Sequence, residues 1–280
     1  MPALVLEGGT FRPIFSCGVM DALLDHDVHF PYVIGVSAGI ADGTSYVSRQ
    51  KGRNYDVLMT YRHDKRYLGM RNYLSDRSMF GLKFVFERIP NELIPFDWDA
   101  YLASETEVRV GVTEAATAKM VYLDGKQMDR QCTMLKATCA LPLILPPITV
   151  NGVQYYDGGL CDSIPAKKAE EDGHSKMLII LTQPAGFHKQ LKNSNKVAAR
   201  MLRHKFPNLE QPLLKRHEMY NRQLDYIARL EQEGRAVVLR PDKEVAIQSF
   251  EKDMDRIDAL YRYGYKLAEE NMDKIKKLFE

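Results

Sequence analysis

The chain has 280 residues, of which 45% are hydrophobic and 27% are charged, and its formal net charge is +2. That charge is too small to imply nucleic acid, and no apolar run approaches the roughly 20 residues that a membrane-spanning helix needs. Met1 and Pro2 lead directly into an apolar run, without the basic segment that opens a signal peptide. We therefore expect a cytoplasmic protein whose contact with membranes, if it has any, is peripheral.

We expect a single domain over residues 1–280, because the sequence shows no internal repeat and no linker rich in proline, glycine and serine. The acidic residues are dispersed, which does not suggest a calcium site. The cysteines show neither a Cys-x-x-Cys spacing nor a nearby histidine pair, so they predict reduced, mostly buried thiols and not a zinc site. We expect neither a metal nor another cofactor. The four cysteines are Cys17, Cys132, Cys139 and Cys161.

The first predicted unit is a strand, a glycine loop and a helix. Residues 3–6 are all apolar, which is typical of a strand covered on both faces of a parallel sheet. The loop over residues 7–13 contains Gly8 and Gly9, and a helix with apolar residues at helical spacing follows. Pro13 suits the first helical turn, where no N–H is needed. Backbone N–H groups at this point of the chain are available to a negatively charged group.

The second unit repeats this plan around Ser37. A buried strand is predicted over residues 32–36, and a helix from residue 38 to about residue 49. Gly35-Val36-Ser37-Ala38-Gly39 lies between them, which predicts a nucleophile elbow with its serine hydroxyl lifted clear of the backbone. Gly35 and Gly39 are small because the turn crowds them against the neighbouring strand and the helix start.

Two such units in succession predict adjacent parallel strands joined by a right-handed crossover. Both loops then lie at the carboxyl ends of the strands, where open α/β sheets bind their ligands. We therefore expect the Gly8 loop and Ser37 to share one crevice.

Residues 55–103 are predicted to form helices and loops that mix cations with large apolar side chains. Met79, Leu82, Phe86 and Ile89 lie on one helical face, and Pro90 is expected to end that helix. We favour a helix packed on the core beside a solvated basic segment. The alternative is an active-site cap that touches an anionic lipid surface. The cations of the basic segment are Arg62, Lys65, Arg66, Arg71 and Arg77.

The middle of the chain predicts two hairpins and a short helix. Residues 107–113 alternate as in a half-buried strand, with residues 119–123 as its partner. A short helix is expected over residues 132–140, and prolines 142, 146 and 147 should then hold the chain extended. Asn151-Gly152 predicts a second hairpin, which delivers the chain to Asp157-Gly158-Gly159.

The last third predicts helices around two short strands. A helix over residues 166–172 precedes a buried strand over residues 176–182, and residues 236–239 form the last strand. Residues 189–222 are basic and helical, and we favour a solvated face over docking on an anionic membrane. A further helix is expected around residues 224–230. One long C-terminal helix should carry on one face Ile257, Tyr261, Tyr265, Ala268, Met272 and Ile275.

A serine nucleophile needs a base to take its proton and donors for the oxyanion that its attack creates. Gly8 and Gly9 permit backbone geometries in which consecutive N–H groups converge. Asp157 can supply the base, since the two glycines after it let its loop approach another backbone closely. Taken alone, Asp157 also fits an ordinary turn aspartate before glycine.

Three motifs together resemble the patatin-like phospholipase family: Glu7-Gly8-Gly9-Thr10-Phe11-Arg12, Gly35-Val36-Ser37-Ala38-Gly39 and Asp157-Gly158-Gly159. The resemblance covers roughly residues 3–182, and residues 183–280 are consistent with the C-terminal part of bacterial members. It implies a three-layer α/β/α fold with a mainly parallel central sheet. It also implies a lipid substrate, whose fatty acyl ester a Ser-Asp dyad hydrolyses without a histidine.

Carried onto this chain, the resemblance makes Ser37 the nucleophile and Asp157 the base. The oxyanion donors are then Gly8, Gly9 and Thr10, and Arg12 braces their loop. Two positions depart from the family: Thr10 replaces a third glycine, and Pro13 replaces a glycine after the arginine. Thr10 keeps its N–H but is expected to lose access to positive φ, and Pro13 removes a donor. The oxyanion hole should therefore be narrower or differently aimed.

Three alternatives stay open from the sequence. A Ser-Asp-His triad of the α/β-hydrolase type could use His174 or His188, although the elbow follows only the second strand here, whereas several strands precede it in that fold. The chain could also be a lipid-binding or regulatory module that kept the elbow without useful turnover. Acyl transfer to an acceptor other than water would use the same dyad.

Overall fold

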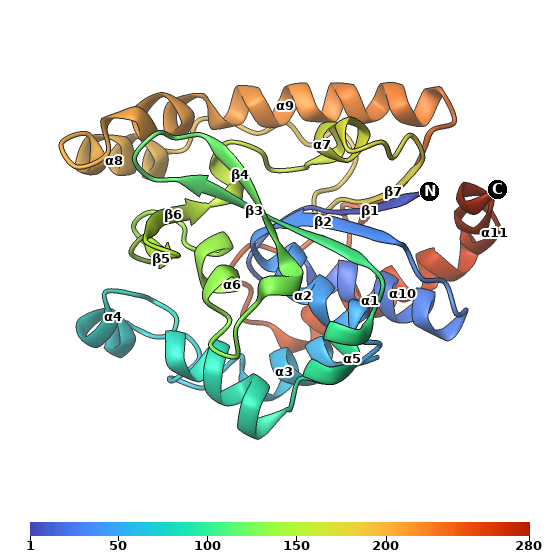
Figure 1. Ribbon diagram of the computed structural model, residues 1–280, viewed down its shortest axis with the longest axis horizontal. Coiled ribbons are helices and arrows are strands. Elements are labelled where there is room, and N and C mark those ends of the chain that lie inside the picture. The colour runs from blue at the N-terminus through green and yellow to red at the C-terminus, as the bar shows by residue number, and fades with distance from the viewer.

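The structure is a computed structural model that describes residues 1–280, apart from the side chains of residues 75 and 76. It has three layers, with a central sheet between α7 and α9 on one face and α1, α2 and α10 on the other (Figure 1). The predicted α/β/α architecture is confirmed.

The helices and strands, in chain order, are β1 (Ala3–Leu6), α1 (Ile14–Asp25), β2 (Tyr32–Val36), α2 (Ser37–Val47), α3 (Arg53–Tyr61), α4 (Met70–Asp76), the π-helix η1 (Phe84–Leu93), α5 (Trp98–Ala103), β3 (Glu107–Glu114), β4 (Met120–Asp124), α6 (Thr133–Thr138), β5 (Ile148–Val150), β6 (Val153–Asp157), α7 (Ala166–Glu171), β7 (Met177–Ile180), α8 (Asn193–Leu202), α9 (Glu210–Gln232), β8 (Ala236–Leu239), α10 (Met254–Glu270) and α11 (Met272–Lys276).

The sheet has eight strands in the order β5-β6-β3-β2-β1-β7-β8, with β4 also paired to β3. The pairs β2–β3, β1–β2, β1–β7 and β7–β8 are parallel. The pairs β3–β4, β3–β6 and β5–β6 are antiparallel. The two expected hairpins and the adjacent parallel strands of the first two units are therefore confirmed. Because β1, β2 and β7 run in the same direction, their carboxyl ends meet at one edge of the sheet.

Alternating side chains of the buried strands supply two hydrophobic cores. Leu4, Leu6 and Val33 face α1 and α10, whereas Val5 and Ile34 face α7 and α9. Burial on both faces explains why β1 and β2 are continuous apolar runs without the alternation of a half-exposed strand.

The C-terminal part of the chain covers both faces of the sheet, since α9 lies on one side and α10 on the other (Figure 1). The helices α1 and α10 cross closely at two glycines. A Cβ at Gly18 would lie 2.1 Å from the Tyr261 carbonyl oxygen, and one at Gly264 would lie 2.2 Å from the Phe15 carbonyl oxygen. Residues 183–280 therefore share their cores with the strands that carry the motifs.

Three expectations about local structure were wrong. Pro90 does not end its helix but lies inside η1, where the wider π-helical turn accommodates a residue without an N–H. The C-terminal helix is not continuous, because it ends at Glu270 and α11 begins after Asn271. The segment after Leu141 is not extended throughout, since it first makes a turn in which Leu143 has φ 70°.

Candidate active site

Ser37 occupies the sharp connection between β2 and α2. Its φ is 56°, a left-handed value that costs energy for a residue with a Cβ. Its backbone N–H donates to the hydroxyl of Thr138, at 2.8 Å, and this hydroxyl donates to the carbonyl of Gly111, at 2.6 Å. The hydroxyl from α6 thus caps the first turn of α2, where the preceding residue supplies no side-chain cap.

The glycine loop and the elbow are in direct contact. A Cβ at Gly8 would lie 2.7 Å from the Cβ of Ser37, and a Cβ at Gly39 would lie 2.4 Å from the carbonyl oxygen of Glu7. A Cβ at Gly35 would lie 2.8 Å from the carbonyl oxygen of Leu6. These distances are too short for any side chain, so the glycines allow the two loops to meet at the edge of the sheet.

The carboxylate of Glu7 anchors the start of the glycine loop. Its side chain is buried, and its two carboxylate oxygens accept hydrogen bonds from the N–H of Thr182, at 2.6 Å, and from the hydroxyl of Tyr220, at 2.8 Å. Arg12 holds the other end of the loop, since Nη1 donates to the hydroxyl of Ser249 at 2.9 Å and its backbone N–H donates to the carbonyl of Gly9 at 3.2 Å.

The structure corrects the expectation about Thr10. Its φ is 59°, so this β-branched residue adopts the left-handed conformation that it was expected to lack. The N–H groups of Gly9 and Thr10 have no acceptor among the residues whose side chains and backbone the structure describes. Pro13 flanks the start of α1 and is not among the residues that line the cavities beside Ser37. Its missing N–H therefore removes no donor from the crevice.

Asp157 is the last residue of β6 and pairs with Val112 of β3. The carboxyl is buried, with Oδ1 accepting the N–H of Gly159 at 2.7 Å and Oδ2 accepting no hydrogen bond from any group that the structure describes. Burial raises the pKa of Asp157, and the positive charge of Arg216 and the Gly159 N–H lower it in part. Asp157 is therefore a stronger base than an exposed aspartate would be.

The loop after Asp157 also depends on close packing. A Cβ at Gly158 would lie 2.4 Å from the carbonyl oxygen of Gly111. The carbonyl of Gly159 accepts hydrogen bonds from Nε of Arg216, at 2.6 Å, and from the hydroxyl of Ser163, at 2.9 Å. The helix α9 thus fixes the loop that carries the carboxylate.

Two cavities meet at Ser37. An apolar cavity of about 170 Å³ lies among α1, α2, η1 and α6, and a polar cavity of about 280 Å³ lies beside the glycine loop. Ser37, Thr10 and Leu141 line both of them. The serine hydroxyl is therefore placed between an apolar space and a polar one.

The apolar cavity contains residues from the predicted cap, including Phe86 and Ile89. This favours the alternative for residues 55–103, in which the segment covers the site, over a helix that only packs on the core. Cys17, Cys132 and Cys139 also line the cavity, and all four cysteines are free thiols, as expected.

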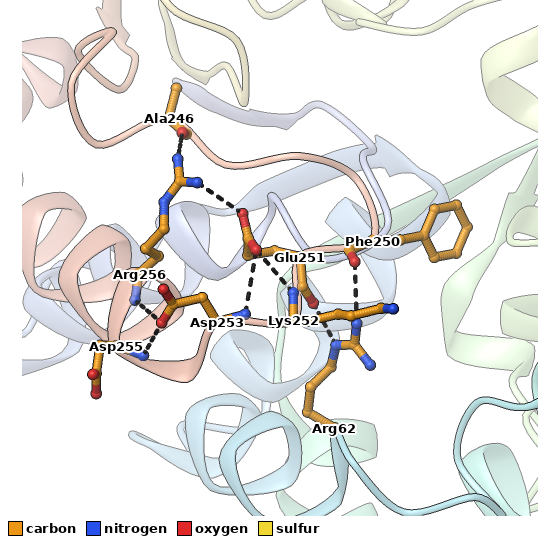
Figure 2. A network of polar contacts seen from close by, with 8 residues as sticks. All are labelled: Arg62, Ala246, Phe250, Glu251, Lys252, Asp253, Asp255 and Arg256. Atoms are coloured by element: carbon orange, nitrogen blue, oxygen red, sulfur yellow. Dashed lines mark hydrogen bonds and ion pairs between the residues drawn. The ribbon is translucent and has the colours of Figure 1, made fainter.

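Arg62 is buried, which corrects its expected place in a solvated segment. Its guanidinium donates to the carbonyl of Glu251, at 2.6 Å, and to that of Phe250, at 3.1 Å (Figure 2). It also stacks 4.5 Å from the ring centroid of Phe11. Arg62 thereby fixes the segment before α10, in which Phe250 lines the apolar cavity and Ser249 the polar one.

The basic stretch over residues 189–222 is not a purely solvated face. Lys189 and Arg216 line the polar cavity together with Arg12, and Arg216 is half-buried beneath the Asp157 loop. Sequence reasoning missed both residues and also Thr138. No local pattern distinguishes an inward-facing cation on α9 from its solvated neighbours.

The two histidines of the alternative triad occupy different places. His174 bonds the carbonyl of Met1, at 2.8 Å, and packs on the ring of Tyr32 at the start of β2, which is the opposite end of the strand from Ser37. His188 is exposed and lines the polar cavity. Within the described part of the chain, no hydrogen bond joins either histidine to Asp157.

Among the residues that the structure describes, no three histidine, cysteine, aspartate or glutamate side chains cluster as metal ligands. In the same part of the chain, no helix has the length and apolar character to cross a membrane.

The fold and the site define an α/β protein with a serine on a strained strand-to-helix elbow beside a buried aspartate. The sequence model of the patatin-like phospholipases matches residues 4–169, which is more than half of the chain. The chain belongs to the patatin-like phospholipase family. A second model, described as a domain of unknown function (DUF6363), matches residues 206–280.

Curated relatives are similar to parts of this chain. The uncharacterized protein YjjU of Escherichia coli K12 is 26% identical over 188 residues, which are 65% of this chain and 52% of YjjU. Lysophospholipase NTE1 of Eremothecium gossypii is 26% identical over 183 residues, 61% of this chain and 11% of that protein. The chain thus spans about half of the first relative and a small part of the second. Among solved structures, VipD from Legionella pneumophila aligns with a TM-score of 0.49 at 11% identity, covering 97% of this chain and 66% of VipD.

The contact between Thr138 and the elbow can be tested by denaturation. Thr138→Val removes the hydroxyl while keeping the side-chain shape, so the Ser37 N–H and the Gly111 carbonyl both lose their buried partner. We expect the free energy of unfolding in urea to fall by about 1–3 kcal/mol. Thr138→Ser keeps the hydroxyl and serves as the control. A Thr138→Val protein as stable as the wild type would show that these bonds do not stabilise the elbow.

Proposed function

We propose that this protein is a serine acyl hydrolase that cleaves fatty acyl esters of lipids through Ser37 and Asp157. The observation that carries the proposal is the position of Ser37, which stands on a strained elbow between an apolar and a polar cavity, with a buried aspartate beside it. An ester of a fatty acid and a polar alcohol has the same two-sided character. Family membership supports the same reaction class.

In the proposed reaction, the Asp157 carboxylate takes the proton of the Ser37 hydroxyl as Oγ attacks the ester carbonyl. The carbonyl oxygen becomes an oxyanion, which accepts hydrogen bonds from the glycine loop. Gly9 and Thr10 have N–H groups without a described acceptor, and Gly8 holds the loop against the nucleophile. Arg12 acts on this hole as a brace, through its bond to Ser249.

Collapse of the tetrahedral intermediate breaks the ester bond, and the alcohol leaves with the proton that Asp157 had taken. Water then attacks the acyl-Ser37 intermediate, again with Asp157 as base, and releases a free fatty acid. The acyl chain would lie in the apolar cavity, where each buried methylene contributes about 0.8 kcal/mol to binding.

We further propose that residues 1–280 work as one domain, because α9 and the segment before α10 supply parts of both cavities. The free cysteines fit a reducing compartment such as the cytoplasm.

Substitution of the two proposed catalytic residues tests the assignment. Ser37→Ala and Asp157→Asn should each lower kcat/KM for short- and long-chain p-nitrophenyl esters by at least about 10³-fold. Ser16→Ala is a matched control, because Ser16 is buried with an unpaired hydroxyl and lines neither cavity. It should keep wild-type activity. Circular dichroism of each variant checks that it is folded.

Two outcomes would replace hydrolysis by another function. If wild-type protein is no faster than Ser37→Ala and a fluorophosphonate does not label Ser37, the chain is a lipid-binding or regulatory module. If the fluorophosphonate labels Ser37 but hydrolysis is slow until a non-water acyl acceptor is added, the reaction is acyl transfer.

The pH dependence follows from the raised pKa of Asp157. The base must be ionised to act, so kcat/KM should fall as pH falls through that pKa, with a midpoint above the ordinary aspartate value of about 3.9. The profile should follow one titrating group and be unchanged in His188→Gln. A step near neutral pH that disappears in His188→Gln or His174→Gln would instead support the serine–aspartate–histidine triad.

A peripheral membrane contact is a further part of this proposal. The helix α4 exposes Met70 and Leu74, and α8 exposes Val197 and Met201; both helices lie on the left side of Figure 1. Cations accompany these apolar side chains on both helices, and α8 also borders the polar cavity. Exposed apolar and basic side chains together favour an anionic lipid surface.

Vesicle binding tests this surface. Wild-type protein should bind vesicles that contain anionic lipid, and the binding should weaken as salt rises. Leu74→Asp combined with Met201→Asp should reduce binding, whereas Leu102→Asp, at an exposed apolar residue of α5, is the control. Equal binding to neutral vesicles at high salt would refute an electrostatic contact.

A further inference from the structure

Ser249 makes two hydrogen bonds to the end of the glycine loop. It lies in the β8–α10 connection, which spans residues 240–253. Its carbonyl accepts the N–H of Phe11, at 3.3 Å, and its hydroxyl accepts Nη1 of Arg12, at 2.9 Å. Phe11 and Arg12 directly follow Thr10, so one residue far along the chain holds two consecutive residues of the loop.

Arg12 connects this contact to the proposed oxyanion donors. Its backbone N–H donates to the carbonyl of Gly9, at 3.2 Å, and a Cβ at Gly9 would lie 3.1 Å from Nε of Arg12. The guanidinium is therefore packed against Gly9. Because Ser249 fixes where this guanidinium lies, it also limits the directions in which the N–H groups of Gly9 and Thr10 can point.

Arg62 links the same two segments a second time. Its guanidinium donates to the carbonyls of Phe250 and Glu251, and it also stacks on the ring of Phe11 (Figure 2). A guanidinium offers several donors in one plane together with a flat face, which an ammonium does not. Arg62 therefore joins the β8–α10 connection, by hydrogen bonds, to the glycine loop, by stacking.

The β8–α10 connection is itself held to the body of the protein, so it can act as a support. Ile247 is buried in the core that α1 and α10 share. Arg256, in the first turn of α10, donates to the carbonyl of Ala246 at 2.8 Å and pairs with Glu251 at 3.4 Å (Figure 2). These contacts lie on both sides of Ser249 in the sequence, so a loop bonded to Ser249 is tied to α10.

The glycine loop needs such a support, because an oxyanion hole is effective only when its donors are already in place. The left-handed conformation of Thr10 is costly, so the loop would relax without contacts that oppose this. We propose that Ser249 is a positioning residue, which acts through Arg12 to hold the N–H groups of Gly9 and Thr10 towards the oxyanion. This inference rests on the hydrolase activity proposed above. It assigns a part in that activity to residues 206–280, which match a domain of unknown function.

Steady-state kinetics separate positioning from binding. Ser249→Ala should lower kcat by about 10–100-fold for p-nitrophenyl butyrate and p-nitrophenyl laurate alike and leave KM nearly unchanged, because both esters form the same oxyanion. Phe250→Ala removes part of the wall of the apolar cavity and should instead raise KM for the laurate alone. Ser175→Ala, at an exposed serine before β7 and outside both cavities, is the control. A Ser249→Ala protein with unchanged kcat, or with only a raised KM, would overturn the proposal.

A double-mutant cycle tests whether Ser249 acts through Arg12. Arg12→Met removes the donor that the Ser249 hydroxyl accepts. If the two side chains act as one unit, the double variant should lose no more kcat than Arg12→Met alone. Losses in kcat that multiply would show that Ser249 acts independently of Arg12, which contradicts the proposed route.

Amide hydrogen exchange gives a readout that does not depend on turnover. In Ser249→Ala and in Arg62→Met, peptides over residues 7–13 should exchange faster than in the wild type, while those over residues 177–180 stay unchanged. Arg66→Met, at an exposed arginine that pairs with Asp64, is the control for Arg62. Faster exchange throughout the chain would show that the contact only stabilises the fold, and the positioning role would then be wrong.

The outcomes distinguish this inference from the function beneath it. If wild-type protein hydrolyses both esters and Ser249→Ala keeps its kcat and its exchange over residues 7–13, the positioning role is wrong while the hydrolase stands. If wild-type protein hydrolyses neither ester, the proposed function fails, whereas hydrogen exchange still reports whether Ser249 holds the loop.

Discussion

The buried carboxylate of Glu7 is the constraint on which the site depends. A buried carboxylate is costly unless hydrogen bonds and opposite charges compensate it. Here the Thr182 N–H at the end of β7 and the Tyr220 hydroxyl on α9 supply those bonds. Glu7 immediately precedes Gly8 and Gly9. Its hydrogen bonds therefore join the glycine loop to the segment that follows β7 and to α9. The loop is then held against Gly39 and Ser37, where no side chain would fit.

The same scarcity of water determines the chemistry of the charged groups around Ser37. Burial raises the pKa of Asp157 and lowers the pKa of Lys189, so each group is shifted towards its neutral form. Arg216 links the two, because its positive charge stabilises the Asp157 carboxylate and opposes protonation of Lys189. On the proposed mechanism, Arg216 therefore keeps Asp157 available as a base in a site where burial alone would favour its neutral form.

The sequence was sufficient for the parts of this structure that local chemistry determines. Apolar runs located β1 and β2, Asn151-Gly152 located the hairpin before Asp157, and glycine spacing located the elbow. It was insufficient where a residue acts across a long sequence separation. Arg62 and Arg216 are ordinary cations in basic segments, and only the fold places them under Phe250 and Gly159. The prediction for Thr10 failed for a different reason. The surrounding structure holds Thr10 at a positive φ, which a β-branched residue disfavours.

The residues around Ser37 come from two segments of the chain that match different family models. Ser37, Asp157 and the glycine loop all lie within residues 4–169, which match the family model. Lys189 lies beyond that segment, and Arg216 and Ser249 lie within residues 206–280, which match a domain of unknown function. The apolar cavity is lined mainly by the first segment, whereas the polar cavity also draws on the later residues. On the proposed function, substitutions after residue 182, other than at Ser249, can therefore change the surroundings of the alcohol part of the ester while Ser37, Asp157 and the glycine loop stay unchanged.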